Sequence, residues 1–105
     1  MDKGQIYLEE IKEFCKKITG FMASLSYEDF LGDEKLQLAI IQLIQNIGEA
    51  AKRLSDETKA RYSNVDWYKV VAMRNRLVHA YMDVDLAIVY DVAVNEVLLL
   101  LKNLE

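Results

Sequence analysis

Proline is absent from the 105 residues of this chain, and only four glycines, one cysteine and one histidine are present. Little in such a sequence would interrupt a helix. A lone cysteine cannot form an intramolecular disulfide or a cysteine-rich zinc site, so neither can hold the fold together. The fold must therefore depend on an apolar core, and Cys15, placed among Ile11, Phe14 and Ile18, is predicted to belong to it.

Long apolar runs and export signals are also missing. Unbroken apolar stretches such as residues 97–101 are far too short to cross a bilayer. No basic segment at the N-terminus leads into an apolar run with a cleavage site. We therefore expect a cytoplasmic protein that does not insert into a membrane.

Apolar residues make up 52% of the chain and charged residues 29%, which is an ordinary globular composition. The sequence contains no repeat, linker or low-complexity tract, so residues 1–105 are predicted to form a single domain. A chain of this length buries only somewhat over ~60% of its unfolded surface. A surplus apolar face would therefore indicate a second copy of the chain, and we expect a homodimer.

Apolar residues recur at spacings of three and four along the whole chain, whereas strand alternation is absent. This pattern predicts long helices over residues 5–24, 34–54, 67–82 and 86–104, with short helical turns near 27–31 and 55–62. The expected N-caps are Ser26, in a capping box with Asp29, and Asp33, Asp66 and Asp85. We predict an all-α protein, an up-down four-helix bundle with short additional helical turns.

The second predicted helix carries apolar residues on two faces, which indicates two neighbours. Leu38 and Ile41 lie beside its main apolar stripe. Gly48, Ala50 and Ala51 are small enough to let another helix approach closely.

Charge is distributed unevenly along the chain. The formal net charge is −4, yet residues 52–76 contain seven basic and three acidic side chains. Such a segment could attract phosphate, although ordinary solvated helix ends would have the same composition. The basic residues are Lys52, Arg53, Lys59, Arg61, Lys69, Arg74 and Arg76.

One segment, residues 74–81, gathers side chains suited to phosphodiester chemistry. Arg74 can bind a phosphate through two hydrogen bonds and stabilise negative charge in the transition state. His79 titrates near neutrality and can move the proton of an RNA 2′-hydroxyl or of a leaving oxygen, without a metal. On a continuous helix Arg74 would align with Tyr81, and Asn75 with His79. A two-fold dimer would supply two histidines, one as base and one as acid.

Arg74, His79 and Tyr81 also form the Arg-x4-6-His-x-Tyr motif, and the chain resembles the HepT-like branch of the HEPN superfamily. The resemblance extends through residues 47–52, 66–67, 73–79 and 84–86. The family often has proline before the tryptophan, where this chain has Asp66, and glycine between the motif histidine and tyrosine, where it has Ala80. Neither difference removes a proposed catalytic group.

The resemblance implies an all-α homodimer with both motifs in a cleft between protomers, acting as a metal-independent ribonuclease toxin. Its partner would be a minimal nucleotidyltransferase antitoxin that transfers AMP from ATP to the motif tyrosine. Arg74 would then hold the scissile phosphate, His79 would act as acid and base, and Tyr81 would accept AMP. Asn75 and Arg76 would orient the RNA substrate, and no resident cofactor or metal is implied.

Three functions remain open from the sequence. The first is an RNA endonuclease toxin that cuts by attack of the 2′-hydroxyl, which DNA lacks. The second is a non-catalytic module that binds a nucleotidyltransferase or a nucleotide. The third is a purely structural helical dimer, in which His79 is structural, Arg74 pairs with Asp66 or Asp83, and Tyr81 packs at a helix end.

Overall fold

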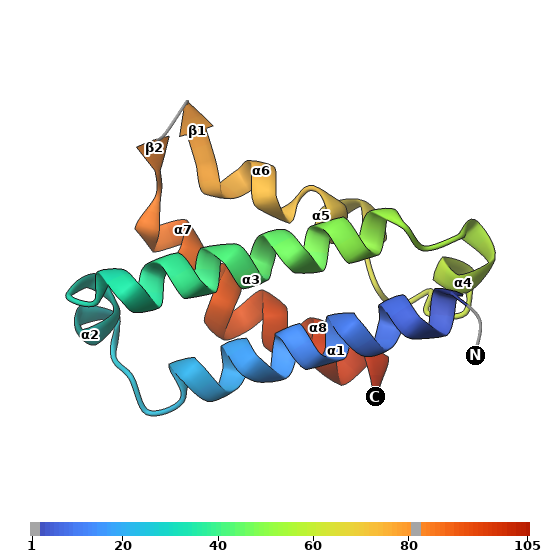
Figure 1. Cartoon of the computed structure of the whole chain (residues 1–105), viewed down its shortest axis with the longest axis horizontal. Coiled ribbons are helices and arrows are strands. Elements are labelled where there is room, and N and C mark those ends of the chain that lie inside the picture. Colours follow the sequence, from blue (N-terminus) through green and yellow to red (C-terminus); the bar gives the residue numbers. More distant parts are fainter. Residues whose placement is uncertain (1–2, 81–82) are drawn as a thin grey trace.

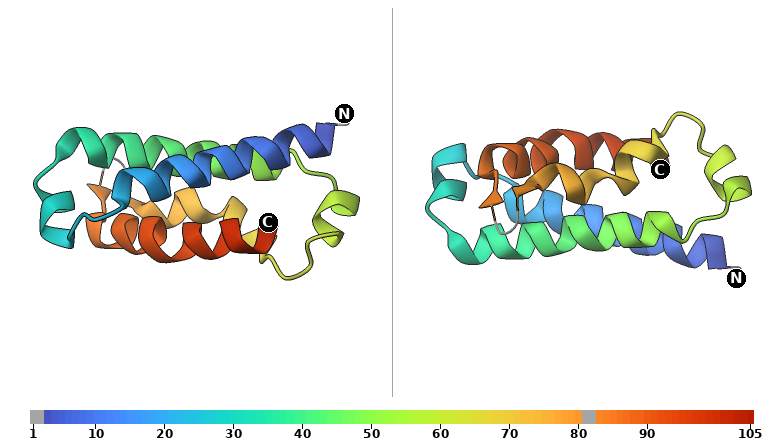
Figure 2. Two further views of the ribbon diagram at one scale, coloured as in Figure 1. Left: turned by 90° about the horizontal axis from the view of Figure 1, so that it is seen from below. Right: turned by 90° about the horizontal axis from the view of Figure 1, so that it is seen from above.

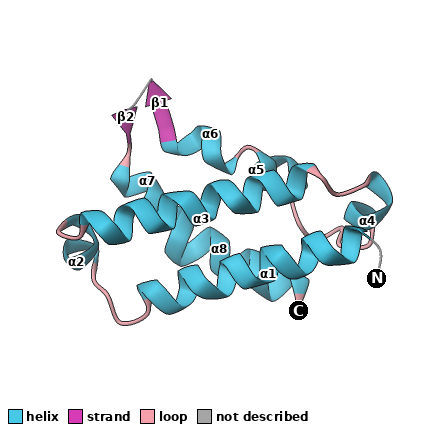
Figure 3. Ribbon diagram, in the orientation of Figure 1, coloured by secondary structure: helices cyan, strands magenta, loops and turns pink. Residues whose placement is uncertain are grey.

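The computed structural model describes residues 3–80 and 83–105, and helices account for most of them (Figures 1 and 3). A two-stranded antiparallel hairpin is the exception to the predicted all-α class. The elements, in chain order, are α1 (Lys3–Met22), α2 (Tyr27–Leu31), α3 (Glu34–Lys52), α4 (Asp56–Ala60), α5 (Trp67–Val71), α6 (Met73–Leu77), β1 (Val78–Ala80), β2 (Asp83–Val84), α7 (Leu86–Asp91), the π-helical turn η1 (Val92–Glu96) and α8 (Val97–Leu104).

The helices form two layers around one apolar core. Helices α1 and α3 lie side by side in one layer, and α5–α6 and α7–α8 form the other (Figure 2). Helix α3 contacts α1 and also α5 and α6, as its apolar residues on two faces predict, but Leu38 beside its main apolar stripe stays 61% exposed. The largest side chains enclosed between the layers are Phe30, Leu8, Ile11, Ile18, Ile40, Ile44, Ile47, Met73 and Leu77.

The helix starts predicted from the sequence are confirmed by the cap geometry. Ser26 and Asp29 form a reciprocal capping box, in which each side chain accepts a hydrogen bond from the backbone N–H of the other. Asp33 accepts a hydrogen bond from the N–H of Leu36, and Asp66 from the N–H of Lys69. The predicted short turn at 55–62 is α4, which Ser55 caps, and Asp85 caps α7.

The third predicted helix, over residues 67–82, is interrupted at Ala72 and is wrong over residues 78–80, while residues 81–82 lie outside the described residues. A turn at Ala72 divides it into α5 and α6, and α6 ends at Leu77. The backbone then pairs with β2 in place of continuing the helical hydrogen bonds, and the N–H of Asp85 donates to the carbonyl of Leu77 at 3.0 Å. The hairpin stands out from the helical body in Figure 1.

Two predicted packing residues lie where the sequence suggests. Cys15 is fully buried, and burial raises the pKa of its thiol to about 12, so it stays a neutral core residue. Gly48 faces α5, where a Cβ atom would lie 3.4 Å from the carbonyl oxygen of Val71. A methyl group at this position would just reach van der Waals contact with α5, and a larger side chain would meet its backbone.

Arg76 and Glu96 form an ion pair that fastens α6 to the turn η1. Arg76 Nη1 and Nη2 donate to the two carboxylate oxygens of Glu96 at 2.6 and 2.8 Å. The Glu96 side chain is only 16% exposed, and Lys69 Nζ lies 3.5 Å from the same carboxylate. The hydrogen bonds from Arg76 lower the pKa of Glu96 despite its burial. Two parallel hydrogen bonds at such distances make this a specific and strong pair.

We predict that Glu96→Gln lowers the free energy of unfolding by about 1–3 kcal/mol at pH 7, because it removes the charge-assisted hydrogen bonds of Arg76. The pair stabilises the fold fully above the ordinary glutamate pKa of about 4.3, and this stabilisation is lost as the pH falls through the lowered pKa of Glu96. Urea denaturation of both proteins should therefore give a constant difference at neutral pH that shrinks below about pH 4.

Glu13→Gln is the matched control, since Glu13 lies on the exposed face of α1, 3.8 Å from Lys16. It should change the free energy of unfolding by less than about 0.5 kcal/mol. Equal stabilities of wild type and Glu96→Gln at pH 7 would contradict the structural role of the Arg76–Glu96 pair.

Candidate functional site

The motif that the sequence singles out spans the junction between α6 and β1. Arg74, Asn75 and Arg76 lie on α6, whereas His79 is the middle residue of β1. Tyr81 falls outside the described residues. The expected alignment of Asn75 with His79 along one continuous helix is wrong, because the helix ends two residues before His79. The expected alignment of Arg74 with Tyr81 lies outside the described residues. The chemical roles assigned to these five residues stay predictions.

Arg74 and Asn75 are exposed and line a hollow of about 270 Å³, hereafter the α3–α5 hollow. Its walls come from α3, α5 and α6, so it combines residues that are far apart in the sequence. The other lining residues are Gln45, Gly48, Glu49, Lys52, Tyr68, Val71 and Ala72. The motif segment and the 47–52 segment, which both carry the family resemblance, therefore meet at one surface.

Two cations of the α3–α5 hollow are open to a ligand. Lys52 Nζ lies 4.0 Å from Glu49 Oε1, and both side chains are more than half exposed, so this pair is weak. Arg74 makes no ion pair within residues 3–80 and 83–105, and the alternative pairing with Asp66 is not formed there. The side chain of Asp83 lies outside the described part. Lys52 and Arg74 are thus the groups that could hold a phosphate.

Arg76 has a different environment from Arg74, although the two are only two residues apart. Its guanidinium donates two hydrogen bonds to Glu96, which raise the pKa of Arg76 above its ordinary value. The side chain is 36% exposed. Arg76 is therefore occupied by an internal partner, so any effect on RNA would come through the position of α6.

The predicted basic patch of residues 52–76 divides into separate environments. The Arg53 guanidinium lies 5.9 Å from the centroid of the Tyr7 ring, and Arg61 Nη2 donates to Thr58 Oγ1 at 3.2 Å. Lys69 shares the carboxylate of Glu96 with Arg76. The basic residues of this segment are therefore not one continuous phosphate-binding surface, and the α3–α5 hollow receives two of them.

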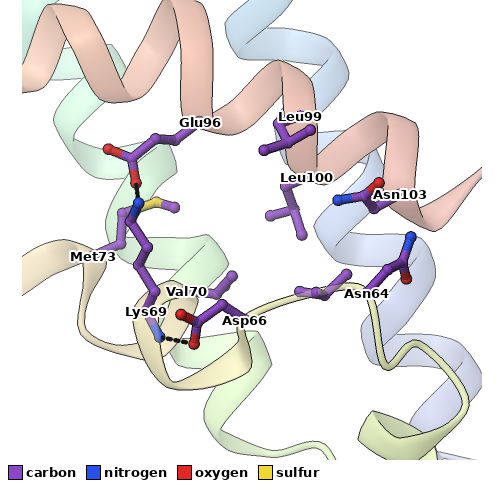
Figure 4. Close-up of a pocket in the computed structure, with 10 residues that line it drawn as sticks. Asn64, Asp66, Lys69, Val70, Met73, Glu96, Leu99, Leu100 and Asn103 are labelled. Atoms are coloured by element: carbon purple, nitrogen blue, oxygen red, sulfur yellow. Dashed lines mark hydrogen bonds and ion pairs between the residues drawn. The ribbon is translucent and has the colours of Figure 1, made fainter.

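A second hollow of about 200 Å³ lies between α5 and α8 (Figure 4). Lys69 reaches along one wall toward Glu96, and Asn64 and Asn103 lie at the opposite edge. Between them the lining is apolar, and none of the described side chains of the predicted site, those of Arg74, Asn75 and Arg76, reaches this hollow. The second hollow therefore adds no group to the predicted chemistry.

Tyr68 and Glu96 were not among the candidate residues taken from the sequence. Tyr68 is 86% exposed at the rim of the α3–α5 hollow, and Glu96 holds the motif helix through Arg76. A signal for Tyr68 was present, because its buried neighbours Trp67 and Val70 leave it on the outer face of a helix that begins at Asp66. The partner of Glu96 depends on packing between distant segments.

Across the two described ranges, no three His, Cys, Asp or Glu side chains converge in a way that could hold a metal ion. Likewise, none of the helices within these ranges is both long and apolar enough to cross a membrane.

Comparison with known proteins identifies the relatives of this chain. A "Probable ribonuclease HepT" of Thermococcus cleftensis is 37% identical over 84 residues, which are 80% of this chain and 76% of that protein. A "Putative RNase" of Methanocaldococcus jannaschii is 32% identical over 94% of this chain and 82% of its own length. Another, from Caldanaerobacter subterraneus, is 33% identical over 87% and 81%. No solved structure gives a significant match.

The family model described as "Ribonuclease HepT-like" matches residues 7–105, which is nearly the whole chain. This match includes α3 with its Gly48 contact, the α3–α5 hollow and the motif at the junction of α6 and β1. The chain belongs to the HepT-like ribonuclease family.

Proposed function

We propose that this protein is a metal-independent RNA endonuclease and the toxin of a toxin–antitoxin pair with a minimal nucleotidyltransferase. The observation that supports it most directly is the position of Arg74. This motif arginine is exposed beside Lys52 in the α3–α5 hollow, without an ion pair among the described residues, and the chain continues from it into the strand that holds His79. RNA in the cell would be the substrate, which makes the cytoplasm the expected location.

The proposed reaction is transesterification within RNA. The 2′-oxygen attacks the adjacent phosphorus and the bond from phosphorus to the 5′-oxygen breaks, which leaves a 2′,3′-cyclic phosphate and a 5′-hydroxyl. Arg74 binds the phosphate and stabilises its added negative charge. His79 accepts the proton of the 2′-hydroxyl, and the partner subunit's His79 gives a proton to the 5′-oxygen. Asn75 orients the substrate beside Arg74, and Arg76 acts with it by holding α6 in place.

A homodimer would supply both histidines, and the apolar surface of the chain supports one. Leu38 on α3 is 61% exposed, on the helix where the sequence predicts apolar residues on two faces. A contiguous exposed apolar surface marks a protein interface, and Leu38 is where we expect that surface on α3. We propose an obligate or tight dimer that places the two motifs in a shared cleft.

We predict that purified protein cleaves RNA in EDTA, and that Arg74→Ala and His79→Ala each lower the rate by at least about 10²-fold while the helical circular dichroism is unchanged. Removal of one transition-state contact or proton-transfer group accounts for a loss of this size. Arg61→Ala is the control, since Arg61 lies at the end of α4 and should leave the rate unchanged. If His79→Ala cut RNA at the wild-type rate, the assignment of His79 would be wrong. RNA binding without cleavage would instead favour the non-catalytic module.

For the dimer, we predict that light scattering at micromolar concentration gives a particle of about twice the 12.1 kDa chain mass. Leu38→Glu should convert it to a monomer, because a buried carboxylate opposes association. Leu99→Glu, on α8, should leave it dimeric. A monodisperse wild-type particle of 12.1 kDa would contradict the dimer and the composite site. Dissociation by Leu99→Glu alone would place the interface on α8.

We further predict that the partner nucleotidyltransferase and ATP add AMP to Tyr81, and that this modification abolishes RNA cleavage. The added phosphate brings negative charge close in sequence to Arg74, where it competes with the substrate phosphate, and the adenosine adds bulk. Mass spectrometry should locate AMP on wild type and on the control variants Tyr62→Phe and Tyr90→Phe, but not on Tyr81→Phe. Full ribonuclease activity of the modified protein would refute this regulation and leave the nuclease proposal standing.

A further inference from the structure

The ring of Tyr68 is 86% exposed at the rim of the α3–α5 hollow, yet the turn that carries it is rigidly held. Trp67, the preceding residue, is buried, and its indole Nε1 donates to the carbonyl of Lys59 at 3.1 Å. Asp66 caps the same turn from the other side. The backbone that carries Tyr68 is therefore held in place, and the ring itself has only two side-chain angles to order when it binds a flat ligand.

Gly48 contributes only backbone to the lining of the α3–α5 hollow. A Cβ atom there would already lie 3.4 Å from the carbonyl oxygen of Val71, and Val71 and Ala72 contribute small apolar surfaces. The volume of about 270 Å³ is just below the usual range of about 300–1,000 Å³ for ligand sites. The hollow therefore suits one nucleotide unit better than a longer segment.

The charges around the hollow suit the phosphates on either side of such a unit. Lys52, Arg74 and Glu49 line it, and the Glu49 carboxylate is 4.0 Å from Lys52 Nζ in a weak, exposed pair. Lys69 and Arg76 are instead held by Glu96. Gln45 and Asn75 add amide groups that can both donate and accept hydrogen bonds. An aromatic ring beside two cations is the combination that binds single-stranded nucleic acid by stacking and phosphate contact.

We propose that the α3–α5 hollow is a subsite for one unpaired nucleotide next to the scissile phosphate, where Tyr68 stacks on the base and Lys52 binds the adjoining phosphate. This inference rests on the proposed ribonuclease function and adds a substrate class to it, RNA that is single-stranded at the site of cleavage. A base within a duplex is already stacked between its neighbours and cannot cover the ring. Tyr68 and Lys52 are binding residues here, and neither takes part in bond breaking.

The test is binding of a short 2′-O-methyl RNA, which lacks the attacking hydroxyl and cannot be cut. Tyr68→Ala should weaken binding about 5- to 150-fold, since stacking on one base is lost, while Tyr68→Phe should stay within about twofold. Lys52→Ala should lower the slope of log affinity against log salt by about 0.7, the value for one phosphate contact on a single strand. A 2-aminopurine base in the RNA should be quenched on binding by wild type and Tyr68→Phe, but not by Tyr68→Ala.

Phe21→Ala and Lys17→Ala are the matched controls, because both residues lie on α1 outside the hollow. Both variants should bind the single-stranded RNA as wild type does. A blunt-ended RNA duplex, in which every base is paired, should bind to wild type and to Tyr68→Ala with equal affinity. Wild-type affinity of Tyr68→Ala for the single strand would overturn the proposal. A change in the oligomeric state of Tyr68→Ala would also overturn the proposal, because it would assign Tyr68 to a protein interface. The RNA used here cannot be cut, so the assay measures binding alone. If the protein proved not to be a nuclease, the difference in RNA affinity between wild type and Tyr68→Ala could still be measured.

Discussion

The close contact of α3 with α5 at Gly48 is the constraint on which the functional surface depends. Helix α3 is packed on one side by α1, so α5 can approach only the face where small residues leave room. A Cβ atom at Gly48 would lie 3.4 Å from the Val71 carbonyl oxygen, which leaves no space for a larger side chain between the two backbones. Because the helices meet there, the motif residues of α6 come to lie beside Lys52, which is more than twenty positions earlier in the chain.

The two arginines of α6, Arg74 and Arg76, have different environments: Arg76 bonds to Glu96, and Arg74 faces the α3–α5 hollow. Residues two apart on a helix point about 200° away from one another, so Arg74 and Arg76 lie on opposite sides of α6. Arg76 turns toward Glu96, in a π-helical turn, and Arg74 lines the α3–α5 hollow. The π-turn is a feature that recurs at functional sites, and here it carries the acid that fixes the motif helix. Arg76 holds α6 in place through Glu96, and Arg74 on the same helix is left exposed in the α3–α5 hollow.

Much of the fold could be predicted because its signals are local. The caps at Ser26, Asp33, Asp66 and Asp85 each need only a side chain and a backbone N–H two or three residues away, and all four are formed. The hairpin could not be predicted in this way. No glycine or proline marks the end of α6. The hairpin strands β1 and β2, of three and two residues, are too short to show an alternating pattern. The π-turn and the Arg76–Glu96 pair, twenty residues apart, depend on tertiary packing that periodicity does not encode.

The same distinction applies to the candidate site. The residue types of the motif were visible in the sequence, but their expected arrangement assumed one helix, whereas Arg74 lies on α6 and His79 on β1. The relative position of these two residues is therefore set by the α6–β1 junction. Two contacts fix that junction on either side: the Arg76–Glu96 pair holds α6 to η1, and the Asp85 N–H bonded to the Leu77 carbonyl closes the base of the hairpin. In the proposed enzyme, Arg74 on α6 would bind the phosphate and His79 on β1 would move the proton, so the distance between them is set by the α6–β1 junction. The geometry of the proposed site would then depend on Glu96, Leu77 and Asp85, to which no contact with RNA is assigned.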